Sequence, residues 1–82
     1  MSTPKRRIVP VRHQVLIRLF ELDGFRVRRT RGDHVMMTKP GIRRPVVIKT
    51  SPGEVPITHI LTNMRTAGMS RDTYFRLLSD VT

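Results

Sequence analysis

Residues 25–50 read FRVRRTRGDHVMMTKPGIRRPVVIKT and contain three predicted strands. The first begins with alternating apolar and polar side chains, and the third is rich in β-branched residues. Arg31-Gly32 and Lys39-Pro40-Gly41 are turn signals between them. The strands are expected at residues 25–30, 33–38 and 45–50. Sequential strands joined by short turns predict an antiparallel meander.

Helices are predicted before and after these strands. In residues 12–23 apolar side chains recur at spacings of three and four, and Gly24 follows where a helix commonly ends. Residues 57–68 repeat the pattern and also end in glycine, while Ser70 can cap a third helix. The order α-β-β-β-α-α predicts an α+β domain with a three-stranded antiparallel sheet and helices on one face.

Charge is the strongest compositional signal. The 82 residues hold 16 Lys+Arg against 6 Asp+Glu, a net charge of +10, and 13 of the cations are Arg. The planar guanidinium suits bidentate phosphate contacts, so RNA or DNA is the predicted partner. The alternatives are a solvated surface or an interface for an acidic protein. The length allows one small domain, expected at residues 11–82 after a basic arm at residues 1–10.

Several classes of protein are excluded. The chain has no cysteine, so a disulfide framework or a thiolate zinc site is ruled out. No apolar run approaches the roughly 18 residues of a membrane span, and the basic first residues lack a signal peptide's apolar segment. A cytoplasmic protein without a membrane partner is expected. The acidic residues are scattered and no phosphate-binding glycine loop is present, so neither a metal nor a cofactor is expected.

His34 is the strongest candidate for chemistry. It follows a tight turn, with Arg28, Arg29 and Arg31 close in sequence. A neutral imidazole can take the proton of a ribose 2′-hydroxyl while cations stabilise the developing phosphate charge, without a metal. The neighbouring arginines disfavour a charged imidazolium and Asp33 favours it, so the direction in which the pKa of His34 shifts is left open. The alternative is a structural or phosphate-binding histidine.

The other histidines are weaker candidates. His13 begins the first expected helix, and we expect it to be exposed. His59 lies near the start of the second, where free backbone N–H groups bind phosphate, although an exposed residue without a role is the simpler interpretation. All four aromatic residues occupy positions that the core can use: Phe20, Phe25, Tyr74 and Phe75. An RRM-like surface of stacked bases is therefore not expected.

Four short segments carry a family resemblance. They are Leu22-Asp23-Gly24-Phe25, Arg29-Thr30-Arg31-Gly32-Asp33-His34, Ala67-Gly68-Met69-Ser70, and Tyr74-Phe75 followed by Leu77-Leu78. Their order and spacing over residues 11–80 resemble the HicA toxins, the mRNA interferases of type II toxin–antitoxin pairs. The family pattern includes Gly-Phe, a basic strand, Gly-Ser-His, a Val-rich strand and Ala-Gly-Leu-Ser. The resemblance implies a fold like that of double-stranded-RNA-binding domains, in agreement with the order of elements.

The resemblance also implies a function. It implies a metal-independent endoribonuclease that cleaves mRNA, with a HicB-type antitoxin as the partner that covers the active face. His34 matches the family histidine and is implied to be catalytic, Gly32 to shape its turn, and Arg29 to match a basic position. The alternative is a non-catalytic RNA- or DNA-binding module of the same fold.

Three departures from the family pattern bear on the site. Asp33 stands where the family usually has Ser, and Thr50 where a second His often ends the Val-rich strand. Residues 54–60, EVPITHI, replace Glu-Leu-x-x-Gly-Thr-Leu and bring His59 in place of Thr. The general acid is left open among Lys39, Lys49 and His59. The expected RNA-contacting residues are Arg28, Arg29, Arg31, Gly32, Lys39 and His59.

Overall fold

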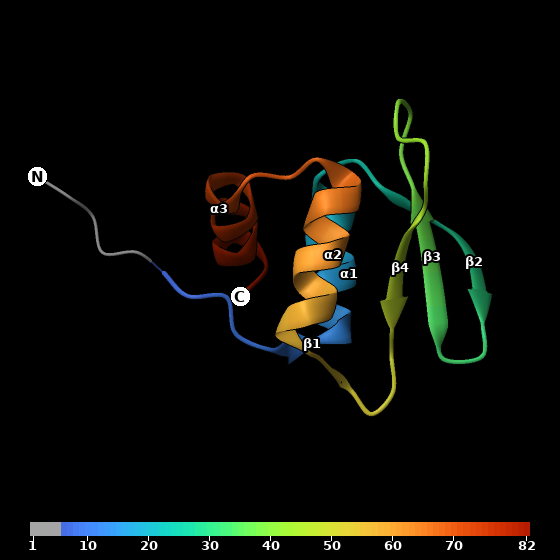
Figure 1. Cartoon of the computed structure of the whole chain (residues 1–82), viewed down its shortest axis with the longest axis horizontal. Coiled ribbons are helices and arrows are strands. Elements are labelled where there is room, and N and C mark those ends of the chain that lie inside the picture. The colour runs from blue at the N-terminus through green and yellow to red at the C-terminus, as the bar shows by residue number, and fades with distance from the viewer. Residues whose placement is uncertain (1–5) are drawn as a thin grey trace, which may run out of the picture.

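The computed structural model describes residues 6–82, so predictions for residues 1–5 of the basic arm lie outside the described residues. In chain order the elements are β1 (Val11–Arg12), α1 (His13–Leu22), β2 (Arg26–Arg31), β3 (His34–Thr38), β4 (Val46–Lys49), β5 (Glu54–Val55), α2 (Ile57–Ala67) and α3 (Arg71–Val81). The helices lie on one side of the sheet, and α3 packs against α1 away from the strands (Figure 1). The predicted α+β architecture is confirmed and is compatible with the fold of double-stranded-RNA-binding domains.

The three predicted helices are present, and the ends of α1 and α2 differ from those predicted by no more than one residue. The apolar stripe of α1 buries Leu16, Leu19 and Phe20. Helix α2 ends at Gly68, whose φ of 64° lies in the left-handed region that favours glycine. Ser70 caps α3 as expected, because its hydroxyl accepts a hydrogen bond from the Thr73 N–H at 3.1 Å.

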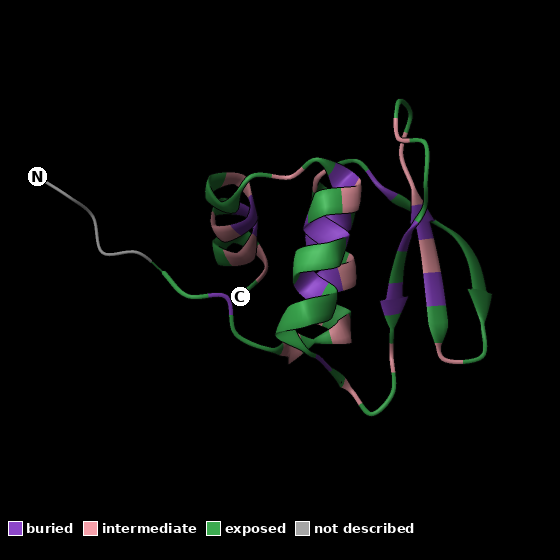
Figure 2. Ribbon diagram, viewed as in Figure 1, coloured by how far each residue is buried: buried purple, intermediate pink, exposed green. Residues whose placement is uncertain are grey.

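The sheet has the order β2-β3-β4 and is antiparallel throughout. Strands β3 and β4 alternate between buried and more exposed residues, so each presents one face to the helices (Figure 2). Their buried residues are Val35, Met37, Val46 and Ile48. Every residue of β2 is exposed. This strand is at the edge of the sheet that lies farther from the helices (Figure 1).

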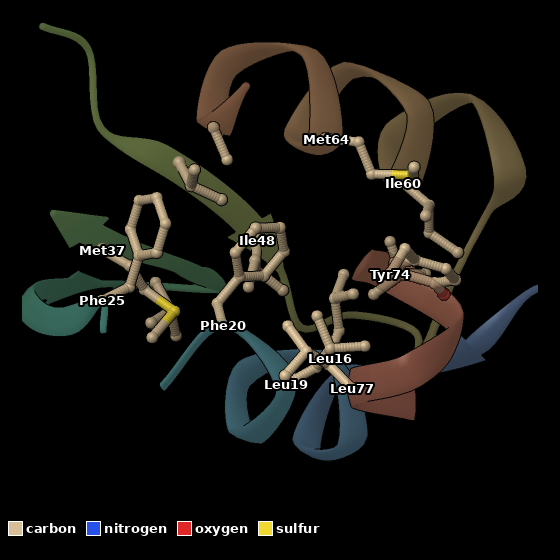
Figure 3. Packing of buried hydrophobic residues seen from close by; sticks show 14 of the residues in the cluster. Leu16, Leu19, Phe20, Phe25, Met37, Ile48, Ile60, Met64, Tyr74 and Leu77 are labelled. Carbon is tan, nitrogen blue, oxygen red and sulfur yellow. The ribbon is translucent and has the colours of Figure 1, made fainter. Parts of the chain in front are cut away.

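One core joins the helices to the inner face of the sheet (Figure 3). Phe20 and Phe25 meet edge to face with ring centroids 5.3 Å apart, and Tyr74 of α3 is fully buried in the same core. Phe75 is half-buried beneath the guanidinium of Arg6, 4.6 Å from the ring centroid. The aromatic side chains therefore serve the packing of the domain, which confirms their predicted use.

The structure adds a small sheet that the sequence analysis did not anticipate. Strands β1 and β5 pair antiparallel, with Val11 opposite Val55. His13, which follows β1, contacts the residue that precedes β5. Its backbone N–H and its ring Nδ1 lie 2.9 and 3.1 Å from the Gly53 carbonyl oxygen. The expectation of an exposed His13 is therefore wrong, because the ring is half-buried and bound to the backbone.

Residues before Val11 also join the core. Ile8 is 7% exposed and packs with the central cluster, although the sequence analysis assigned it to the arm. Arg71 donates a hydrogen bond to the Arg6 carbonyl, which ties this segment to α3. Within residues 6–82, no helix is both long and apolar enough to cross a membrane.

Candidate active site

His34 lies in a row with two cations across one end of the sheet. It pairs in register with Arg31 of β2 on one side and with Lys49 of β4 on the other. Directly opposite residues of antiparallel strands project to the same face, with Cβ atoms about 4.5–5.5 Å apart. All three side chains are exposed. The imidazole is therefore flanked by a guanidinium and an ammonium.

A bulge in β2 brings further arginines to this face. The register of β2 against β3 shifts between Val27 and Arg29, which leaves Arg28 as the extra residue. Strict alternation would place Arg28 and Arg29 on opposite faces of the sheet. Instead, both line one hollow of about 360 Å³ together with Met36 and Pro45.

The face of the sheet opposite the buried side chains of β3 and β4 is therefore strongly basic, and we call it the open face. Arg26 also belongs to the open face, because it pairs with Thr38 of β3. Thr38 is four residues from His34 on the same strand, so both side chains project to the same face of the sheet. The cations of the open face are Arg26, Arg28, Arg29, Arg31 and Lys49.

Asp33 orients His34. The carboxylate Oδ1 lies 3.0 Å from Nδ1 of the ring, and the two side chains are 41% and 51% exposed. In a neutral ring, a proton on Nδ1 can be donated to this carboxylate, and Nε2 is then the unprotonated nitrogen. Gly32 makes the turn before the pair with φ 57°, a left-handed conformation that side chains rarely adopt. The Ser-to-Asp departure thus adds an orienting group to the site.

Thr50, the second departure, fixes the same turn from β4. Its backbone N–H and its hydroxyl both donate to the Asp33 carbonyl oxygen, at 2.7 and 3.2 Å. The end of β4 is thereby tied to the residue beside His34. The side chain that replaces the family histidine has a structural role here.

The third departure, His59, comes to the same place from α2. His34, Lys49 and His59 line one cavity of about 210 Å³, with Val47 and Thr62. Along the chain, the rest of β3, the strands β4 and β5 and the first residues of α2 separate His34 from His59. Only the packing of α2 beside β4 brings them together.

Asn63 holds α2 in this position. It is 4% exposed and lines the same cavity. In the amide orientation that satisfies both of its polar atoms, the nitrogen donates to the carbonyl oxygens of Val47 and His59, each at 3.1 Å. One side chain therefore joins the helix backbone at His59 to β4. Asn63 was not among the residues predicted for the site, although its polar character within an otherwise apolar helix face was an available signal in the sequence.

Lys39 is at the other end of β3 from His34, roughly 16 Å along the strand at the usual rise per residue. Its Nζ is 3.3 Å from the Asp23 carboxylate and 5.3 Å from the centre of the Phe25 ring. The fold does not bring Lys39 into the cavity of His34. Of the three candidates for the general acid, only Lys49 and His59 line that cavity.

The sequence was compared with known protein families. A family model described as the HicA toxin of bacterial toxin-antitoxin matches residues 14–69. The chain belongs to the HicA toxin family. The matched region begins within α1 and ends after α2, so it contains both His34 and His59. No curated protein matches the chain.

HicA membership identifies the protein as a toxin of a toxin–antitoxin system. Among residues 6–82, no three His, Cys, Asp or Glu side chains gather in a group that could hold a metal ion. The chemistry available at its cavity is that of two imidazoles, one ammonium and the neighbouring guanidinium groups.

Proposed function

We propose that this HicA toxin is an endoribonuclease that cleaves mRNA in the cytoplasm and so blocks translation. The Asp33–His34 pair carries the proposal, because it sets an oriented imidazole between Arg31 and Lys49. A surface that only binds phosphate needs cations but has no use for an oriented base. Cleavage of RNA at its own 2′-hydroxyl requires both.

In this proposal, His34 is the general base. Asp33 accepts the hydrogen bond from Nδ1–H, which leaves Nε2 free to take the proton of a ribose 2′-hydroxyl. The 2′-oxygen then attacks the adjacent phosphorus. Arg31 and Lys49 flank the imidazole in the row and stabilise the negative charge that develops on the phosphate oxygens. These steps use side chains alone and call for no cofactor.

The open face supplies the binding surface for a single RNA strand. Arg28 and Arg29 are both available on it because of the bulge. Gly32 has open space where a Cβ would lie, so a sugar–phosphate backbone can approach the turn closely. We also propose that a HicB-type antitoxin covers this face, since acidic groups on that partner would complement its charge.

The second candidate function is a non-catalytic RNA- or DNA-binding module. The half exposure of the Asp33–His34 pair favours it, because two exposed side chains are held only weakly in one geometry. In that case His34 is one more group beside the phosphates. The two functions differ in what the removal of the His34 imidazole does to RNA.

The test is cleavage of a long unstructured RNA in the presence of EDTA. We expect the wild type to cut, His34→Ala to bind RNA without cutting, and Arg76→Gln on α3 to cut like the wild type. Thermal unfolding checks that His34→Ala is folded. Equal cutting by the wild type and His34→Ala refutes the role of His34, and binding without cutting by all three proteins establishes the non-catalytic module.

A further inference from the structure

We infer that His59 is the general acid of this site, the group that protonates the leaving 5′-oxygen. The inference rests on the proposed function and deepens it by naming a second catalytic residue. It starts from one observation: the two histidines that the sequence places on different elements line the same small cavity. The family motif alone does not point to it, since His59 stands where the resemblance expects Thr.

The cavity has the size and the lining for one phosphodiester group. Its volume of about 210 Å³ is smaller than the roughly 300–1,000 Å³ of typical small-molecule pockets. His34 enters from β3, Lys49 from β4 and His59 from the first turn of α2. A phosphate in this space is approached from the sheet and from the helix, which is the arrangement that separate base and acid groups require.

The position of His59 is held by the fold even though its ring is exposed. Asn63 bonds the His59 carbonyl oxygen to β4, because the same amide nitrogen also donates to Val47. The buried Ile60 and Met64 anchor the same helix in the core. The backbone that carries the imidazole therefore cannot move away from β4 without breaking these contacts.

The chemistry of the side chains favours His59 over the lysines. An imidazolium is a much better proton donor near neutral pH than a lysine ammonium, and a general acid works best when it titrates near the working pH. Lys39 lies at the far end of β3 with Asp23. Lys49 pairs in register with His34, and its ammonium group is suited to stabilise the phosphate.

The complete step balances with these two histidines. The 2′-oxygen forms a bond to phosphorus, and its proton goes to Nε2 of His34. The bond from phosphorus to the 5′-oxygen breaks, and a proton from the His59 imidazolium goes to that oxygen. The products are a 2′,3′-cyclic phosphate and a free 5′-hydroxyl. Exchange with water returns both imidazoles to their starting protonation states.

The experiment uses a pair of matched RNA substrates. One has the ordinary 5′-oxygen at the cleavage site, and in the other this oxygen is replaced by sulfur. A thiolate leaves without being protonated, because thiols are far stronger acids than alcohols. On the oxygen substrate we expect His59→Ala to be slower than the wild type by about 10²–10⁴, the usual contribution of a positioned acid. On the sulfur substrate it should cut nearly as fast as the wild type.

Two variants with changes in the same cavity are the controls. His34→Ala should be slow on both substrates, because the base is needed whatever group leaves. Lys49→Ala should also be slow on both, since the phosphate charge develops in both reactions. The pH dependence is a second readout: the wild-type rate should fall on the alkaline side as the acid loses its proton, and His59→Ala should lack that fall.

The outcomes separate the inference from the function it rests on. Loss by His59→Ala that is equal on the oxygen and sulfur substrates overturns the assignment, as does wild-type activity of His59→Ala on the oxygen substrate. In both cases cleavage that depends on His34 still stands. If the wild-type protein cuts neither RNA in EDTA, the proposed function fails and the role of His59 fails with it.

Discussion

Replacing Arg29 and Arg31 together with glutamine should make RNA binding less sensitive to salt. Both arginines belong to the open face, where five cations can each neutralise one phosphate of a bound strand. Each such contact releases counterions from the RNA, so the number of contacts sets how steeply affinity falls with salt. The substitutions remove two charges and keep side chains that are polar and nearly as long.

The expected size follows from the count of cations. With five contacts, the slope of log affinity against log salt for a single strand is about −3.5, and with three contacts about −2.1. Between about 50 and 200 mM salt, the wild-type face then loses about 100-fold in affinity and the variant about 20-fold. At low salt the variant should already bind more weakly.

The assay is fluorescence anisotropy of a labelled, unstructured RNA across this salt range, in a His34→Ala background that prevents cleavage. The matched control replaces Arg18 and Arg76 with glutamine, two exposed arginines on α1 and α3. This control has the same net charge as the test variant but an intact open face. If both double variants flatten the slope equally, the overall charge of the protein drives binding and the open face is not the RNA surface.

Three further substitutions test the packing and the site. Ile8→Ala should lower the free energy of unfolding by about 2–4 kcal/mol in denaturant titrations, because Ile8 is buried in the core. Burial raises the pKa of Tyr74 above 10.0, although Arg6 opposes the shift. Stability should therefore be fully present below pH 10.0 and fall as pH rises through the folded-state value. Thermal melts of Tyr74→Phe should lack this loss of stability at alkaline pH. At neutral pH this variant should be as stable as the wild type or up to about 1 kcal/mol more stable, because the Tyr74 hydroxyl has no hydrogen-bond partner among the described residues. Asp33→Ala should reduce the rate of RNA cleavage by about tenfold while changing stability by less than about 0.5 kcal/mol, because it orients His34 from an exposed position.

Each of these has a result that contradicts it. An Ile8→Ala protein as stable as the wild type would mean that the segment before Val11 adds nothing to the core. A tyrosinate absorbance that titrates at the value of a free tyrosine would remove the basis for the Tyr74 prediction, and the chain has only one tyrosine to observe. Full activity in Asp33→Ala would show that His34 does not depend on the carboxylate.

The elements of secondary structure could be predicted from the sequence because their signals are local. Buried residues of α1 recur with the helical period, and β3 and β4 alternate as half-buried strands do. The turn before His34 and the glycine after α2 are likewise determined by their own residues. Local signals of this kind also identified His34 as the candidate base.

The composition of the site depended on contacts that no local pattern contains. The bulge that puts Arg28 beside Arg29 is a property of the pairing between β2 and β3, and strict alternation along β2 would have separated them. The pairing of β1 with β5 changed His13 from an expected exposed residue to a partner of the backbone.

The choice of a general acid shows most clearly what is local in the sequence and what depends on tertiary contacts. From the sequence, Lys39, Lys49 and His59 were equivalent alternatives, because each is a proton donor at an unspecified distance from His34. The length of β3 separates Lys39 from His34, and Lys39 contacts Asp23 there, while Asn63 joins α2 at His59 to β4. Sequence alone determined which residues could carry out the chemistry, since that depends on side-chain type. The tertiary structure decided which of them share a cavity, because the distance between side chains is set by the packing of helices and strands remote in the chain.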